Sequence, residues 1–326
     1  MKNWKKASIG ALCVMSLLAG CGMQGGKDDG NGGKDDTPMD VTLETLREVN
    51  DPCVLLAKYD AVTVNIQGTD RDGEVTYTAR LQYTDGGGEA FLMSSHYSYT
   101  ANSGPGEDEL WSQGNDSLYA TRMASNDTAS LNLYPIPGEG TEYLREMLPQ
   151  CTDPAAKNAE ETLDERSEQD GAVLLSTTTR FDDQDYYYTT LYYADPETGE
   201  LLAMSVTDYM ADGDGGATEM GTTLYNWSYD EPYEPDREIL NEVVCATDDA
   251  NENSCLLTVC FPKKSAGDWS AKEYNVEKGT YVTICCSMGC TLYADAALTQ
   301  PIDDTVSIDT SGEEMTVYVL PDVPLD

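Results

Sequence analysis

Acid–base and nucleophilic chemistry in this chain is limited by its single histidine, His96, in the run Ser94-Ser95-His96-Tyr97. A nucleophile–histidine–acid arrangement would have to use that residue. The Gly-x-Ser-x-Gly turn that exposes the serine of many hydrolases is absent from the sequence. Acidic residues number 59, too many for a glycosidase-like pair to be singled out. We therefore expect no catalytic residue and no cofactor, and a hydrolase is the least supported function.

The cysteines are the second group with chemical potential. Ten are present; Cys13 and Cys21 lie near the amino terminus, and the other eight follow the linker described below. An even number in an exported chain predicts disulfides. Cys53 and Cys151 are expected to pair with each other, and the pairing of the six cysteines at 245–290 stays open. A zinc site is the alternative, but structural zinc prefers Cys-x₂-Cys spacings, which the cluster at Cys285 lacks. The disulfide candidates are Cys53, Cys151, Cys245, Cys255, Cys260, Cys285, Cys286 and Cys290.

One acidic stretch partly matches a calcium-binding loop. Asp208, Asp212, Asp214 and Glu219 are its candidate ligands, around Gly213. Met210 occupies a position that should carry an oxygen ligand, and both flanks are typical of strands. A glycine-rich hairpin turn explains the same residues, so we predict no metal site and retain this stretch only as a weak calcium candidate.

The amino terminus predicts export. Three lysines precede the apolar segment 7–19, and Leu18-Ala19-Gly20 stands directly before Cys21. This is the pattern of a signal peptide, too short for a permanent membrane span. The four residues resemble the lipobox of bacterial lipoproteins. The resemblance implies cleavage between Gly20 and Cys21 and attachment of lipid, such as palmitate, to Cys21. Two acyl chains give stable anchoring, so we expect an extracytoplasmic protein anchored to the bacterial membrane.

The charge of the chain excludes one class of partner. The formal net charge is −40, and removal of residues 1–20 with their three lysines gives −40 − 3 = −43. Nucleic acids bind to basic surfaces, so a nucleic-acid partner is excluded. An acidic surface favours solubility and basic or cationic partners.

Residue patterns divide the chain into four parts: a signal peptide (1–20), a Gly/Asp-rich linker (21–40), a domain at 41–236 and a Cys-rich domain at 237–326. Leucine spacing predicts helices over 41–59, with a new start at Asp51-Pro52. Asp153-Pro154 likewise predicts a helix to Arg166, after a shorter one at 141–148. Alternating apolar residues predict strands elsewhere, at 61–67, 75–83, 89–99, 110–113, 117–123, 129–134, 172–181, 186–194, 201–210 and 221–229.

The region 41–236 resembles a known family. It has a leading helix, a long meander and a helical excursion, followed by the aromatic strand and acidic turn at 192–202 and a strand ending at Tyr229. This order is similar to the Lol-type lipoprotein-carrier half-barrel, with its LppX-like lipid-anchored relatives. The resemblance implies a curved sheet around an apolar cavity that holds a lipid. The chain has 21 tyrosines against 3 phenylalanines, which departs from a purely apolar cavity.

The region 237–326 has strand candidates at 255–261, 273–276, 280–285, 291–293 and 315–320. It is loosely similar to the β-grasp repeat of internalin-type surface proteins, although the usual Gly-Trp-Tyr signature is absent. We thus predict a mainly β (α+β) protein: a curved antiparallel half-barrel with a few helices, then a small disulfide-rich β domain.

The functional expectation is a membrane-anchored, non-enzymatic binding protein whose half-barrel holds a lipid or other apolar ligand. The alternative is an adhesion or interaction module, in which the region 237–326 captures a cell-wall or protein partner.

Overall fold

The computed structural model describes residues 40–85, 91–101, 104–113, 116–123, 129–134, 159–181, 185–211, 216–229, 231–234, 238–245, 253–263, 268–286, 289–302 and 307–322. The predicted signal peptide, Cys21 and the predicted helix at 141–148 lie outside these residues. In the described part of the chain, no helix has the length and apolar character needed to cross a membrane.

Two short helices open the described chain, α1 (Leu43–Val49) and α2 (Pro52–Lys58). The Thr42 side chain accepts a hydrogen bond from the backbone N–H of Thr45, which caps α1. The helix ends at Asn50, and α2 begins at the proline after Asp51. The predicted helical region and its break at Asp51-Pro52 are therefore confirmed.

Most of the chain forms one large sheet of two antiparallel meanders. In space its strand order is β17-β15-β6-β5-β4-β3-β2-β1-β11-β10-β9-β8-β7. The first meander contains β1 (Ala61–Asp70), β2 (Val75–Asp85), β3 (Phe91–Ala101), β4 (Gly104–Gln113), β5 (Asp116–Met123) and β6 (Ser130–Tyr134). The second contains β7 (Ala159–Gln169), β8 (Ala172–Phe181), β9 (Tyr186–Ala194), β10 (Leu201–Ala211) and β11 (Ala217–Ser228).

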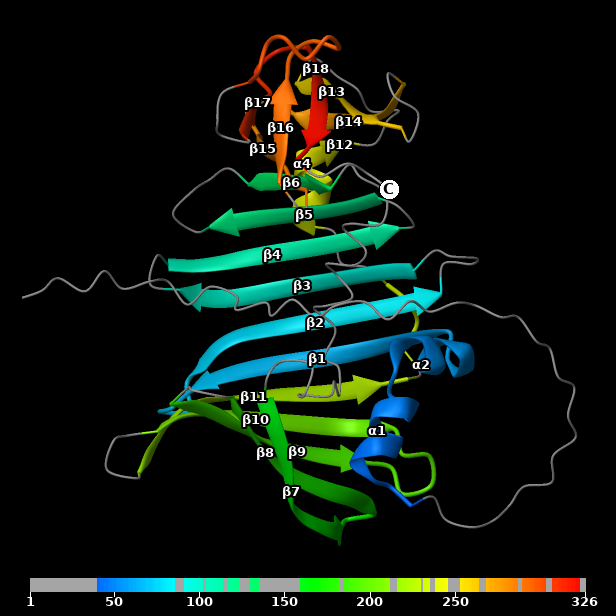
Figure 1. The fold of residues 1–326 in the computed structure, drawn as a ribbon, viewed down its shortest axis with the longest axis vertical. Helices are drawn as coiled ribbons and strands as arrows, with labels where there is room; N and C mark the ends of the chain where they lie inside the picture. Colours follow the sequence, from blue (N-terminus) through cyan, green and yellow to red (C-terminus); the bar gives the residue numbers. More distant parts are fainter. Residues whose placement is uncertain are drawn as a thin grey trace, which may run out of the picture.

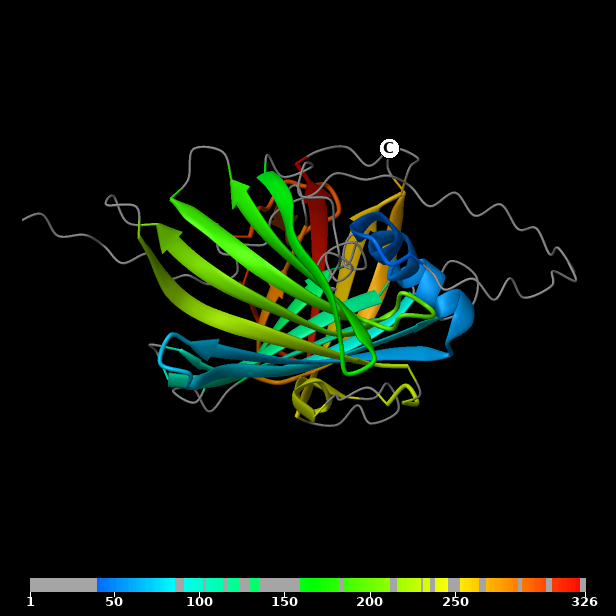
Figure 2. The same cartoon turned by 90° about the horizontal axis from the view of Figure 1, so that it is seen from below.

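Pairing between β1 and β11 joins the two meanders, with Val64 opposite Trp227. The sheet bends at this junction, so that the second meander rises beside the helices (Figure 1, Figure 2). We call the face that carries α1 and α2 the inner face, and the opposite face the outer face. The large curved sheet with few helices confirms the prediction of a mainly β, half-barrel-like fold.

The last part of the chain forms a second sheet and also extends the first. The second sheet has the order β12-β14-β13-β18-β16. Its strands are β12 (Val244–Cys245), β13 (Ser254–Pro262), β14 (Trp269–Glu277), β16 (Cys290–Tyr293) and β18 (Glu314–Pro321). The remaining strands, β15 (Tyr281–Ile284) and β17 (Ser307–Asp309), belong to the large sheet, where β15 pairs in parallel with β6.

A single buried cluster connects the two sheets. Helix α4 (Glu238–Val243) places Ile239, Leu240 and Val243 against Leu118 of β5 and Leu131 of β6. Residues of β13, β15 and β18 complete the same cluster. The regions predicted as two domains, 41–236 and 237–326, thus share both a core and a sheet.

The predicted helix from Asp153 to Arg166 is wrong over residues 159–166, which belong to the strand β7. Residues 159–166 contain three glutamates, which favour helices. Pairing along the whole of β8, from Ala159 opposite Phe181 to Gln169 opposite Ala172, replaces the local preference. Residues 153–158 lie outside the described part.

Candidate ligand-binding face

The inner face of the large sheet is the strongest candidate for a binding surface. Polar anchors hold the two helices over it. Arg47 of α1 forms an ion pair with Glu161 of β7, and Lys58 at the end of α2 forms one with Glu200. The hydroxyl of Tyr59 also donates to Glu200, at 2.6 Å. Because both carboxylates are largely buried, these contacts fix where α1 and α2 lie.

Beneath the helices the face is apolar and buried. Leu55 of α2 packs against Val64, Ile66 and Leu81. Leu46 of α1 packs against the group formed by β8, β9 and β10. The same two clusters continue outward into side chains that are only partly buried: Tyr77, Tyr97, Tyr119, Val206, Tyr225 and Trp227. The face therefore changes from a closed core below the helices to an accessible aromatic surface beside them.

Two tyrosines lie flat across neighbouring strands because glycines leave room for them. A Cβ atom at Gly68 would stand 2.0 Å from a ring carbon of Tyr77, and one at Gly106 would stand 2.6 Å from the ring of Tyr99. Gly68 is opposite Tyr77 in the register, as Gly106 is opposite Tyr99. The Tyr77 hydroxyl continues past β1 to Thr223 of β11, at 2.9 Å.

Replacing Gly68 with alanine should therefore displace the Tyr77 ring and lower the free energy of unfolding by about 1–3 kcal/mol, the usual cost of overpacking. Urea denaturation measures the effect. If the ring is the cause, the same substitution should cost much less in a Tyr77→Ala background. Additive costs in this double-mutant cycle would show that the clash with Tyr77 is not responsible.

Two carboxyl groups lie among these tyrosines, on the same face. Asp108 of β4 accepts hydrogen bonds from Tyr119 (2.8 Å) and Tyr99 (3.4 Å), one on each carboxylate oxygen. Asp208 of β10 accepts one from Tyr186 at 2.5 Å. Burial raises the pKa of both aspartates above the ordinary value, while the phenol hydrogen bonds act in the opposite direction.

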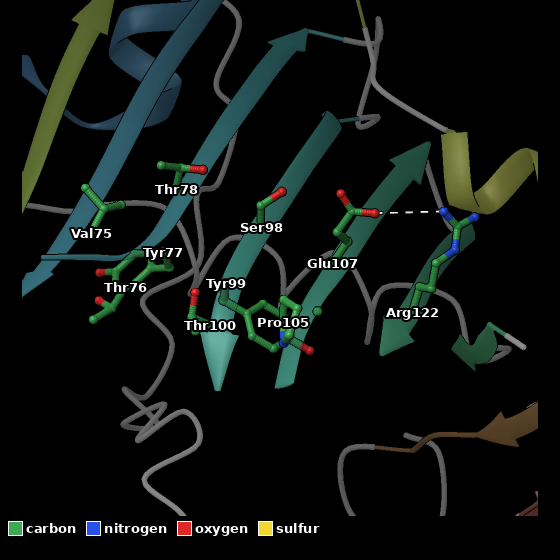
Figure 3. A pocket seen from close by; sticks show the side chains of 11 residues that line it. Val75, Thr76, Tyr77, Thr78, Ser98, Tyr99, Thr100, Pro105, Glu107 and Arg122 are labelled. Atoms are coloured by element: carbon green, nitrogen blue, oxygen red, sulfur yellow. Dashed lines mark ion pairs between the residues drawn. The ribbon is translucent and has the colours of Figure 1, made fainter. Parts of the chain in front are cut away.

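The outer face carries two hollows. One of about 430 Å³ crosses β2 to β5 and is lined by Thr78, Ser98, Glu107 and Arg122, with the last two 3.8 Å apart in an ion pair (Figure 3). A second of about 380 Å³ adjoins it at Thr78 and includes His96. The acidic groups beside Arg122 leave little positive charge for an anionic ligand, since Glu242 pairs with it as well.

His96 forms part of a serine–histidine–acid row in the outer hollows. Its Nδ1 is 3.3 Å from Oε1 of the fully buried Glu109, and its Nε2 is 3.4 Å from the Ser98 hydroxyl. The backbone around Ser98 pairs with β2 on one side and β4 on the other. Its N–H groups are therefore not free to form an oxyanion hole. Glu109 also accepts the backbone N–H of Leu240 at 2.9 Å, which indicates a structural role in docking α4.

The calcium candidates do not converge in the described residues. Asp208 is opposite Gly221, whereas the next residue, Tyr209, is opposite Glu219. Adjacent strand residues point to opposite faces, so Asp208 and Glu219 lie on different sides of the sheet and cannot bind one ion together. Asp212 and Asp214 lie outside the described residues. Within the described part of the chain, no group of three or more histidine, cysteine or acidic residues could hold a metal ion.

The predicted disulfides are not formed among the cysteines whose side chains are described: Cys255, Cys260, Cys285, Cys286 and Cys290 are all thiols in the structure. Cys255 and Cys260 stand five residues apart in β13, which directs them to opposite faces of the strand. Burial raises the pKa of Cys285 to about 11, with a contribution from nearby Cys290. The side chains of Cys53, Cys151 and Cys245 lie outside the described residues, so their pairing stays a prediction.

The sequence analysis did not predict that Asp108 and Asp208 lie among tyrosines on one face of the sheet. The alternation in β9 and β10 gives the face of each residue, but not the neighbour across the strands. The signal that was available is the excess of tyrosine over phenylalanine, since tyrosines facing a wholly apolar core would leave hydroxyls without partners.

No family model matches the chain, and no curated protein matches it. Among solved structures, it is similar to the lipoprotein LppX from Mycobacterium tuberculosis (13% identity, TM-score 0.33, covering 59% of this chain and 98% of that one). It is also similar to LprF from Mycobacterium bovis (8% identity, TM-score 0.30, covering 60% of this chain and 97% of that one). A putative outer membrane lipoprotein-sorting protein domain from Vibrio parahaemolyticus shows 11% identity, a TM-score of 0.26, and coverage of 60% and 94%. These proteins are of the kind that the sequence resemblance indicated.

Proposed function

We propose that this chain is a membrane-anchored, extracytoplasmic, non-enzymatic protein that binds a lipid-like amphiphile on the inner face of its curved sheet. The supporting observation is that the apolar surface is continuous. The buried clusters below α1 and α2 pack directly against the half-buried Tyr97, Tyr225 and Trp227. Burying such rings against an apolar chain would remove further apolar surface from water. Tyrosine hydroxyls at the edge suit a ligand that is apolar at one end and polar at the other.

Anchoring through Cys21 is the second part of the proposal, and it rests on the lipobox-like sequence before that residue. The full chain should fractionate with the membrane, and Cys21→Ser should shift it to the soluble fraction, because the acyl chains would be missing. An unchanged distribution of the variant, or an unmodified amino terminus by mass spectrometry, would contradict the anchoring.

Binding can be tested with an uncharged fluorescent fatty alcohol whose emission rises in apolar surroundings. Val206 lies on the inner face of β10, and Ser205 faces the other way on the same strand. We expect Val206→Asp to weaken binding about tenfold or more, because it places a charge among apolar contacts. Ser205→Asp is the matched control and should bind as the unchanged protein does. Equal binding by both variants, or no uptake by the unchanged protein, would overturn the proposal.

The alternative function, capture of a cell-wall or protein partner by residues 237–326, stays a prediction.

A further inference from the structure

Asp208 is a half-buried carboxylate on the inner face of β10. One of its oxygens, Oδ1, accepts the Tyr186 hydroxyl. Among the described residues, no lysine, arginine or histidine forms an ion pair with Asp208. A partly desolvated charge without a counter-charge is unfavourable for the folded protein. Asp108, a second carboxylate of the inner face, differs because a tyrosine hydroxyl donates to each of its oxygens.

An aromatic cluster lies beside Asp208 on the neighbouring strands. Phe181, Tyr186 and Tyr188 form a cluster with ring centroids 5.6, 5.9 and 6.4 Å apart. Tyr188 is directly opposite Asp208 in the register of β9 and β10. Burial raises the pKa of the Tyr77, Tyr188 and Tyr225 phenols, and the nearby Asp208 charge contributes to each shift. The Asp208 carboxylate therefore contacts Tyr186 of β9 and lies near tyrosines of β2, β9 and β11, and Phe181 of β8 packs against Tyr186 and Tyr188.

Rings and a carboxylate in this arrangement attract organic cations. The faces of aromatic rings are negative, and quaternary ammonium groups are recognised by aromatic cages. A divalent metal ion fits less well, since calcium takes six to eight oxygen ligands and magnesium needs octahedral geometry. The net charge of the chain, −40, would draw cations towards the surface.

The position of Asp208 on its strand connects it to the apolar part of the inner face. Met204, Val206 and Asp208 follow one another at two-residue intervals, and each therefore points to the inner face. Met204 is buried in the cluster below α1, whereas Val206 and Asp208 are partly exposed. The distance along the strand from Met204 to Asp208 is about 13 Å. A ligand could thus contact the apolar surface with its chain and Asp208 with its headgroup.

We propose that Asp208, with Tyr186, Tyr188 and Phe181, binds the ammonium headgroup of a cationic amphiphile, an inference that rests on the proposed binding of amphiphiles by the inner face. The carboxylate supplies the counter-charge, and the rings replace the water around the cation. The apolar chain of the ligand lies along Val206 towards the helices.

The test compares three amphiphiles of equal chain length on the full protein: decyltrimethylammonium, decanol and decyl sulfate, each by calorimetric titration below its micellar concentration. The unchanged protein should bind the cation about tenfold more tightly than the alcohol, within the range of a cation–aromatic contact next to a carboxylate. Asp208→Asn should remove this preference and leave decanol binding unchanged. Tyr188→Leu should reduce the preference while keeping the apolar contact.

Asp108→Asn is the matched control, because it removes a carboxylate of the same face whose two oxygens already have phenol donors. It should keep the cation preference, which excludes a general effect of the acidic surface. A preference unaffected by Asp208→Asn would overturn this inference and leave the proposed function intact. Failure of all three amphiphiles to bind the unchanged protein would overturn both. Thermal melting of each variant verifies that it is folded.

Discussion

Replacing Asn50 with leucine should lower the free energy of unfolding by about 3 kcal/mol, through buried backbone groups left without partners. The Asn50 side chain donates to the carbonyl oxygens of Leu46 (2.8 Å) and Gly199 (3.0 Å). Its Oδ1 accepts the backbone N–H of Leu201 at 2.9 Å. Leucine has similar volume but cannot form any of these three hydrogen bonds. Urea denaturation, followed by tryptophan fluorescence, gives the change in stability.

The large effect is expected because Asn50 joins two parts of the fold that are far apart in sequence. It ends α1, and Gly199 and Leu201 border the turn that leads into β10. Without it, the main polar contacts between the helices and the sheet would be the Arg47–Glu161 and Lys58–Glu200 pairs, beside the apolar packing of Leu46 and Leu55. Ion pairs in which one partner stays accessible to water are usually worth no more than about 1 kcal/mol.

Asn226→Leu provides the control for this prediction. Asn226 is an exposed residue of β11, so its replacement should change the stability by about 0.5 kcal/mol or less. A cost at Asn50 no larger than at Asn226 would mean that water replaces the lost hydrogen bonds, and that the junction between α1 and β10 is open.

Local patterns were enough to predict most strands of the large sheet. The bounds 172–181 and 186–194 agree with β8 and β9, because alternating residues and polar turns are visible in the sequence itself. Pairings between distant segments of the chain cannot be recognised from a local sequence pattern. The contact of β1 with β11 joins residues more than 150 positions apart, and it is this contact that brings Tyr77 next to Thr223.

The candidate site was less accessible to sequence reasoning than the fold. Asp208 was selected for a calcium loop, whereas its neighbours in the structure are tyrosines from other strands. The chain has 59 acidic residues. Among the described ones, Glu109 and Glu200 are buried and Asp108 and Asp208 are partly buried, and burial depends on the assembled sheet. The β7 segment also shows that local preference is not sufficient for prediction. Its residues favour a helix, but they pair with β8 as an edge strand.

Ending the chain at Asp236 should prevent stable folding of the remainder. The truncation removes Ile239 and Leu240 of α4 and Val282 and Ile284 of β15, all buried against β5 and β6. It would expose the apolar side chains of Leu118, Leu131 and Leu133 and leave the edge of β6 without its partner strand. Exposed apolar surface beside an unpaired strand favours aggregation. We therefore expect aggregates in gel filtration and loss of the near-ultraviolet circular dichroism signal.

A milder pair of variants tests the same interface without removing any segment. Val282 is fully buried in the shared core, whereas the preceding Tyr281 is 61% exposed on the other side of β15. Val282→Asp should destabilise the protein by about 3 kcal/mol or more, because a charge would be buried without a partner. Tyr281→Asp should have little effect. A soluble, monomeric truncated chain, together with equal stabilities of the two variants, would show that residues 41–236 fold without the carboxy-terminal part. In that case α4 and β15 would be dispensable additions to a sheet that is already stable, and the amphiphile-binding face could be studied on the shorter chain.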